Sequence, residues 1–202
     1  MIKCIIFDIG GVIVDFYNAD DYYPYLSRIS GIPLKTINKI IDYDIRIDLD
    51  NGAATQKEFD AQVAKQLGIK KKNILWYEFY KKKVKLERGT INIIKKLHGK
   101  YVLSYLSNTD RSRYTYTVEK ILKPYLHLFD YRFASCDIKM RKPGRGIYMY
   151  ALRHMRIKSS QALFIDNQIE NVVGARKVGI KSIWFKNSKD LKEKLKKMKI
   201  RL

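Results

Sequence analysis

Residues 4–13 read CIIFDIGGVI, an apolar run that ends abruptly at Asp8 and resumes after two glycines. A buried strand that carries Asp8 at its carboxyl end, and then opens into a glycine turn, places this carboxylate beside bare backbone N–H groups. Such N–H groups bind anions, and a carboxylate next to a bound anion can act as a nucleophile. The alternative interpretation is a strand that ends in an ordinary turn, with Asp8 as an N-cap.

The length and composition of the chain fit one domain of ordinary size, or one core domain with a small insert. It has 202 residues, 46% of them hydrophobic. No apolar run approaches the roughly 20 residues of a membrane-spanning helix, and the short first run is not typical of a signal peptide, so no membrane partner is expected. The two cysteines, Cys4 and Cys136, lack metal-ligand spacing, which predicts a reduced, cytoplasmic location.

The strongly basic composition indicates an anionic partner. Lysine and arginine total 41 against 20 acidic residues, a formal net charge of +21. A field of this sign attracts phosphorylated ligands, nucleic acid or anionic lipid, although lysine-rich surfaces also arise from a biased composition, as in thermophile proteins. No known nucleic-acid motif accompanies the charge, and the 15 tyrosines are spread through helical patterns. The charge therefore allows a nucleic-acid partner, but the sequence does not favour one.

Apolar runs with strand character alternate with helical patterns along most of the chain. The runs cover residues 2–7, 101–106, 131–134, 162–165 and 181–185, and helices are expected at 90–97, 111–122, 146–155, 170–178 and from 188 onward. This alternation predicts an α/β fold with a parallel sheet and helices on both faces.

The segment between about Asp20 and residue 86 breaks this rhythm, because it has helix signals and no strand-like run. Residues 55–58 form a capping box that opens a helix, and this helix ends at Gly68. A second amphipathic helix is expected at 74–84. The sequence therefore predicts a helical insert after the first strand, above the carboxyl end of the sheet.

Three predicted strands end in polar residues. The first ends at Asp8, the second is followed by Ser107 and Asn108, and a later one by Asp166 and Asn167. The carboxyl ends of parallel strands meet at one edge of a sheet, where ligands bind. Pro143 holds the preceding residue, Lys142, in an extended loop between these strands. A single polar strand end is usually a simple cap. The ordered set of Asp8, Ser107, Lys142 and Asp166 is a far more specific signal of a functional site.

With these motifs the chain resembles the haloacid dehalogenase superfamily of hydrolases. The matching segments are FDIGGV (7–12), LSN (106–108), RKP (141–143) and FIDN (164–167), followed by Asn171 and Gly174, in the family's order over nearly the whole chain. The subgroup that it resembles most is that of small-molecule phosphatases whose first motif reads Asp-x-Gly. The resemblance implies a Rossmann-like core, residues 1–15 and 88–202, and a helical cap, residues 16–87.

The resemblance also implies a mechanism and a set of site residues. The substrate would be a small phosphorylated metabolite, and Asp8 would attack its phosphorus to form an aspartyl-phosphate. Catalysis is assigned to Asp8, Ser107 and Lys142. The phosphoryl oxygens would bind to the backbone N–H groups of Ile9 and Gly10 and to Ser107, Asn108 and Lys142. A magnesium ion would bind to Asp8, the carbonyl of Gly10, Asp166 and Asn167.

Two positions depart from the common family pattern. Gly10 occupies the position of a second aspartate that protonates the leaving group, and loss of a general acid costs about 10²–10⁴-fold in rate. Asp15, on the segment that leads into the cap, is an alternative acid, and so are a residue of the cap and the substrate's own groups. Asn167 occupies the position of another aspartate, which weakens a magnesium site without removing Asp166.

Two alternative functions stay open. The first is a catalytically idle family member that binds a phosphorylated ligand, nucleic acid or a protein partner. The second is a haloacid dehalogenase, which is less favoured because the last motif of that branch is rich in serine. Substrate identity depends on the cap, where Arg46, Trp76 and Tyr80 either face the crevice or are a surface arginine and two core aromatics.

Overall fold

The computed structural model describes residues 1–16 and 21–202, and its centre is a five-stranded parallel sheet in the order β5-β4-β1-β6-β7. The strands are β1 (Cys4–Phe7), β4 (Val102–Ser107), β5 (Tyr131–Ala134), β6 (Ala162–Asp166) and β7 (Lys181–Trp184). Phe7 pairs with Tyr105 on one side and with Ile165 on the other. The residues that follow β1, β4 and β6 therefore emerge side by side at the carboxyl edge of the sheet.

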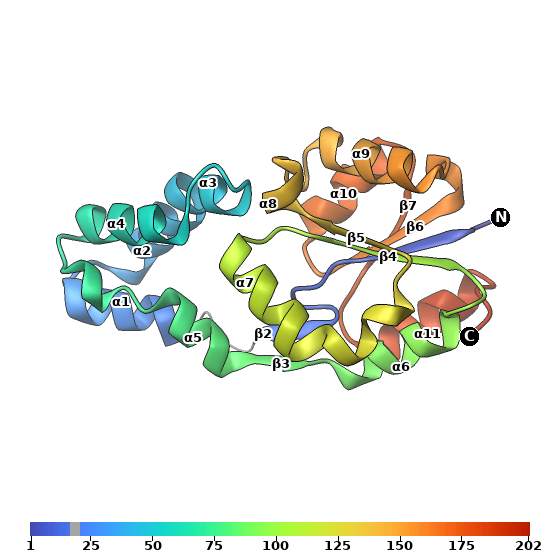
Figure 1. Cartoon of the computed structure of the whole chain (residues 1–202), viewed down its shortest axis with the longest axis horizontal. Helices are drawn as coiled ribbons and strands as arrows, with labels where there is room; N and C mark the ends of the chain where they lie inside the picture. Colours follow the sequence, from blue (N-terminus) through green and yellow to red (C-terminus); the bar gives the residue numbers. More distant parts are fainter. Residues whose placement is uncertain (17–20) are drawn as a thin grey trace.

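Helices cover both faces of this sheet, which confirms the predicted α/β class (Figure 1). Ile5 and Phe7 belong to one hydrophobic cluster and Cys4 and Ile6 to another, because successive strand residues point to opposite faces. The first cluster includes α6 (Arg88–Leu97) and α11 (Ser188–Lys197), and α7 (Arg111–Tyr116) packs on the same side. The second cluster includes α9 (Arg145–Met155) and α10 (Ile169–Lys177).

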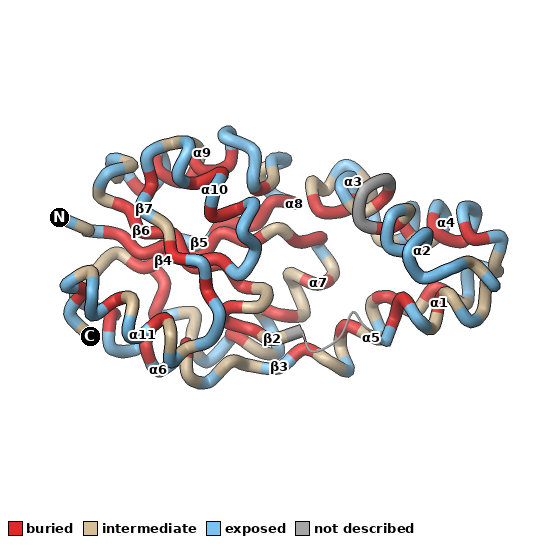
Figure 2. The backbone as a smooth tube through the Cα atoms, turned by 180° about the vertical axis from the view of Figure 1, so that it is seen from behind, coloured by how far each residue is buried: buried red, intermediate tan, exposed pale blue. Residues whose placement is uncertain are grey.

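Residues 22–83, between β1 and β4, form a helical lobe beside the sheet (Figure 1). Its helices are α1 (Tyr22–Ser30), α2 (Leu34–Lys39), α3 (Arg46–Asp50), α4 (Gln56–Leu67) and α5 (Trp76–Lys83). They enclose a hydrophobic cluster of their own, and Figure 2 shows buried positions on their inner sides. The predicted capping box is confirmed, because the Thr55 side chain accepts from the N–H of Glu58 and the Glu58 carboxylate accepts from the N–H of Thr55.

A short antiparallel pair of strands, β2 (Val14–Phe16) and β3 (Val84–Leu86), connects this lobe to the sheet layer. The prediction that residues 20–86 contain no strand was wrong at β3, and the helix expected to reach Val84 ends at Lys83. Val84, Lys85 and Leu86 alternate as a strand does, but three residues are too few for a recognisable pattern. The strand forms because it pairs with β2. Asp20, near the predicted start of the insert, lies outside the described residues.

The remaining connections are short helical turns, among them η4 (Thr117–Leu122), η5 (Lys123–Leu128) and α8 (Ser135–Ile138). The helix expected at 111–122 is observed as α7 and η4. Pro124 does not end the helical path there, because it lies in the first turn of η5, where its missing N–H costs nothing. Among the described residues, no helix combines the length and the apolar character needed to cross a bilayer.

Candidate active site

The carboxyl edge of the sheet holds a buried cluster of three charged side chains from distant parts of the chain. The Lys142 ammonium donates to Asp8 Oδ1 over 2.8 Å and to Asp166 Oδ2 over 2.7 Å. Lys142 is 1% exposed and Asp166 is fully buried. The three residues thus come together as the order of their motifs predicts.

Two asparagines hold this cluster in place. The side-chain amide of Asn108 donates to the carbonyl of Lys142 and accepts from its N–H, each over 2.8 Å. Asn171 donates to Asp166 Oδ2 over 3.1 Å, and the N–H of Gln168 donates to Asp166 Oδ1 over 2.7 Å. The Asn108 amide is therefore engaged in positioning Lys142. Its predicted role in phosphate binding stays a prediction, for which its backbone N–H is the available donor.

The cluster carries two carboxylates against one ammonium. Burial raises the pKa of Asp8 to about 7; the Lys142 ammonium opposes this rise and the Asp166 carboxylate adds to it. Burial alone would lower the pKa of Lys142, but Asp166 and Asp8 outweigh it, so that this pKa is raised and the ammonium stays charged. When both acids are ionised, a net negative charge lies in a buried place, where a cation or a proton is stabilised.

The turn after β1 has the shape that its glycines predict. Gly11 has a φ of +77°, which favours glycine, and a Cβ there would overlap the Asn167 side chain. The N–H of Gly11 closes the turn onto the carbonyl of Val14. Among the described residues, the N–H of Gly10 takes no part in the backbone bonds of this turn, whereas the N–H of Ile9 donates to the Asp8 carboxylate and lowers its pKa. Both residues line the neighbouring cavity, and the N–H of Gly10 can bind an anion there. The phosphate contact of Ile9 stays a prediction.

This cavity, of about 820 Å³, lies between the sheet edge and the helical lobe. It is lined by nearly all of the predicted site residues, namely Asp8, Ile9, Gly10, Ser107, Asn108, Lys142 and Asn167, while Asp166 lies behind Lys142 and outside the lining. Asp15 lines it too. Arg46, Trp76 and Tyr80 line it from the lobe. The two aromatics are buried members of hydrophobic clusters at the same time, so the core interpretation, which the helical spacing favours for them, holds together with a place in the lining.

A second charged network was not anticipated from the sequence. Arg113 donates to Asp110 and, over 2.5 Å, to Asp50 Oδ1, which belongs to α3 of the lobe. Ser135 also donates to the carbonyl of Asp50. Asp110 could be expected as the N-cap of α7, but Asp50 lies 63 residues from Arg113, and no local pattern signals such a pair. These contacts hold the lobe against the sheet layer beside the cavity.

The donor set at the sheet edge fits a hard divalent cation. Asp8, Asp166, the Gly10 carbonyl and the Asn167 amide offer oxygen atoms only, as magnesium prefers. The excess negative charge of the buried cluster supports the same conclusion. Among the described residues there is no group of three histidine, cysteine or acidic side chains that could hold a metal, so carbonyl and amide oxygens would have to complete the set.

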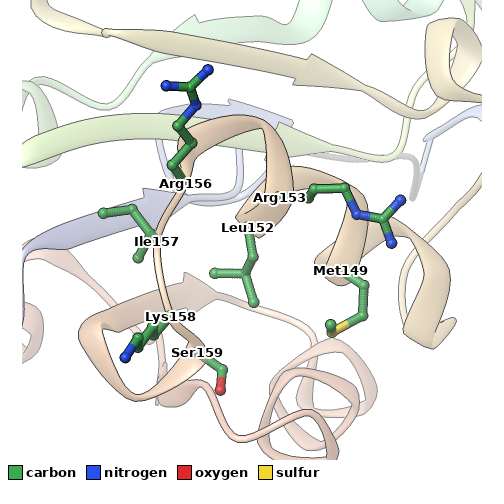
Figure 3. Close-up of a pocket in the computed structure, with 7 residues that line it drawn as sticks. All are labelled: Met149, Leu152, Arg153, Arg156, Ile157, Lys158 and Ser159. Carbon is green, nitrogen blue, oxygen red and sulfur yellow. The ribbon is translucent and has the colours of Figure 1, made fainter.

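A separate hollow of about 580 Å³ lies at the carboxyl end of α9. Figure 3 shows Arg153, Arg156 and Lys158 around its apolar residues Met149, Leu152 and Ile157. None of the predicted site residues lines it. The predicted site residues that line a cavity therefore line the one at the sheet edge.

Comparison with known proteins places this geometry in a family. Residues 2–179 match the family model of haloacid dehalogenase-like hydrolases. The chain is 22% identical to the sesquiterpene phosphatase astK of Aspergillus oryzae, over 92% of this chain and 91% of that protein. It is 23% identical to a D-ribitol-5-phosphate phosphatase of Bacteroides thetaiotaomicron, over 96% and 97% of the two chains. It also matches the drimenol cyclase drtB of Aspergillus calidoustus, of which it spans only 36%.

A solved structure of a family enzyme from Bacteroides thetaiotaomicron, in complex with magnesium and inorganic phosphate, has the same fold. Its TM-score is 0.75 at 22% sequence identity, over 93% of this chain and 96% of the other. The match to the family model covers most of the chain and includes all four motifs. This protein is a member of the haloacid dehalogenase-like hydrolases.

Proposed function

We propose that the protein is a magnesium-dependent phosphatase of a small phosphorylated metabolite, with residues 16–87 as the cap that covers the substrate. The observation that carries this proposal is the Lys142 ammonium bound to both Asp8 and Asp166, with Asp8 and Lys142 on the wall of the cavity. Two relatives that align over nearly their whole length bear phosphatase names, and the neighbour of the same fold binds magnesium and phosphate.

In the proposed reaction, Asp8 attacks the phosphorus atom and the P–O bond to the alcohol breaks. Lys142, the Ser107 hydroxyl and the N–H groups of Ile9 and Gly10 hold the phosphoryl oxygens, and such positioning supplies most of the catalysis in phosphoryl transfer. Water then attacks the phosphorus of the aspartyl-phosphate, which releases inorganic phosphate and regenerates the Asp8 carboxylate.

Magnesium, when bound to Asp8, Asp166, Asn167 and the Gly10 carbonyl, supplies positive charge that offsets the charge of the phosphoryl group. The Lys142 ammonium is a second positive charge beside the proposed metal. It neutralises one of the two buried carboxylates, which leaves one negative charge for magnesium. These metal and phosphate ligands are part of the proposal, and the first experiment tests them together.

Purified protein is expected to release phosphate from a panel of small phosphomonoesters when magnesium is present, and to lose this activity in EDTA. A colorimetric phosphate assay measures the released phosphate.

Asn167→Asp adds a charged oxygen ligand, so it should lower the magnesium concentration that gives half-maximal activity by about 10-fold. No turnover across a broad panel with magnesium would sink the proposal, and salt-sensitive binding without turnover would favour the idle-binder alternative.

Gly10 cannot donate a proton, so we assign the general acid to Asp15, which lines the same cavity. Asp15 would protonate the leaving alcohol and take a proton back from the attacking water. Asp15→Asn is expected to lower kcat by about 10²–10⁴-fold for alkyl phosphates, but by much less for p-nitrophenyl phosphate, whose leaving group needs no proton. Steady-state kinetics on both substrates checks this, and an equal loss on both would assign the acid elsewhere.

A further inference from the structure

One continuous patch of the cavity lining, which we call the arginine patch, consists of Arg46, Asp50, Trp76, Arg113 and Arg141. Asp50 links its members. Its Oδ1 binds Arg113 Nη2 over 2.5 Å, and its Oδ2 lies 3.6 Å from Arg46 Nε and 3.9 Å from Arg141 Nη2. The guanidinium carbons of Arg46 and Arg113 lie 5.2 and 5.5 Å from the centre of the Trp76 ring.

Two N–H groups of this patch are buried without an acceptor. Within the part of the chain that the structure describes, Trp76 Nε1 and Arg141 Nε have no hydrogen-bond partner, and Trp76 is only 7% exposed. A buried donor without an acceptor is unfavourable, because it has given up its hydrogen bond to water without a replacement. Both residues line the cavity, so a bound ligand can supply the missing acceptors.

Arg141 is held more weakly than Arg113. Its distance of 3.9 Å to Asp50 is at the limit of an ion pair, and the same carboxylate already binds Arg113 over 2.5 Å. The Arg141 side chain is 31% exposed. It can therefore turn toward a ligand without breaking a close contact.

The chemistry of these donors defines the ligand. An indole N–H and a guanidinium donate hydrogen bonds and accept none, and the guanidinium matches the planar oxygen pair of a carboxylate or phosphate. The neighbouring lining residues Tyr22, Phe79 and Tyr80 are aromatic and suit a nonpolar or flat body. The fitting group is an anionic oxygen group attached to such a body.

We propose that the arginine patch binds an anionic group on the leaving alcohol, so that the preferred substrates are phosphomonoesters that carry a second carboxylate or phosphate-like group. This inference rests on the phosphatase activity proposed above. Asp8 and Lys142 take the phosphoryl group that is transferred, while Arg141 and Trp76 take the anion that leaves with the alcohol. Arg141 and Trp76 are then specificity-determining residues for the reaction.

The test compares kcat/KM for phenyl phosphate, 4-carboxyphenyl phosphate and 4-phosphonophenyl phosphate, which share one body and differ in the second anion. We expect the wild type to favour one or both anionic substrates. Arg141→Gln should lower this preference by about 10-fold or more, Arg141→Lys by less, and Trp76→Phe, which keeps the ring and loses the N–H, by about 3- to 10-fold. Arg153→Gln, an exposed arginine far from this cavity, is the matched control and should leave the preference unchanged.

Two results overturn the inference while leaving the phosphatase proposal intact. One is equal turnover of all three substrates by the wild type, and the other is an equal loss on all three in Arg141→Gln. Calorimetric binding of the same compounds to the Asp8→Asn protein with magnesium tests the patch without turnover. In this experiment, Arg141→Gln should lower the affinity for the two anionic compounds selectively. Equal affinities for the three compounds would again overturn the inference.

Discussion

Asp8→Asn is expected to abolish phosphate release and at the same time to make the metal-free protein more stable at pH 8. An amide is not a nucleophile toward phosphorus, so activity should fall by at least about 10³-fold. The amide oxygen that replaces the carboxylate still accepts from Lys142, while the excess negative charge of the buried cluster disappears. The stability gain is on the order of 2–4 kcal/mol, from the raised pKa of Asp8.

The pH dependence identifies the cause of this gain. The folded protein binds the Asp8 proton more tightly than the unfolded chain does, so wild-type stability falls as the pH rises from about 4 to about 7. The Asp8→Asn protein does not lose stability in this way. The difference in the free energy of unfolding between the variant and the wild type should therefore be large at pH 8 and small at pH 5. Urea unfolding in EDTA at both pH values measures it.

The matched control for this experiment is Asp48→Asn, at an exposed position outside the cavity. It makes the same change of side chain without touching the buried cluster, and its unfolding curves should follow the wild type at both pH values. A destabilised Asp8→Asn protein at pH 8 would contradict the assignment of excess buried negative charge. Retained turnover would contradict the nucleophile.

Lys142→Met is expected to have the largest effect on stability. It removes the ammonium that pairs with Asp8 and Asp166, and breaking a buried ion pair by removing one partner costs about 3–5 kcal/mol. The methionine fills much of the space, so the loss reflects charge more than packing. Activity should disappear as well, since the phosphoryl group loses its buried cation.

The loss should depend on pH in a defined direction. Without Lys142 the pKa of Asp8, which burial already raises, rises further, so the variant is least stable at pH 8 and recovers as the pH falls and Asp8 takes up a proton. Adding Asp8→Asn to Lys142→Met should restore part of the stability at pH 8, because one buried charge is gone. Lys192→Met, at an exposed position of α11, is the control. A loss of equal size at both pH values would point to packing instead.

The sheet and the residues at its carboxyl edge could be predicted because their signals are local. Each strand is a short apolar run, and Asp8, Ser107 and Asp166 end such runs or follow them directly. The parallel arrangement then brings them together without any knowledge of side-chain contacts. The order of the motifs also predicted that Lys142 belongs to the site, although it lies 134 residues from its partner Asp8.

The features that escaped prediction depend on pairs with no local pattern. Strand β3 forms because it pairs with β2 across almost seventy residues of chain. The bond between Asp50 and Arg113 joins two side chains that each resemble ordinary surface charges in the sequence. Asn108 could be assigned to the site, but its two hydrogen bonds with the backbone of Lys142 depend on the loop path around Pro143. Such features follow from tertiary packing alone.

The pairing of β2 with β3 bears on how this molecule can diversify. Val14 lies opposite Leu86 and Phe16 opposite Val84, so the chain departs for the lobe and comes back at neighbouring points, about 5 Å apart as in any antiparallel pair. A segment that leaves and re-enters the fold at neighbouring points can be lengthened, shortened or exchanged while the central strands and Asp8 keep their positions. Changes in the lobe sequence can thus alter which substrate binds, while the residues at the carboxyl edge of the sheet stay the same.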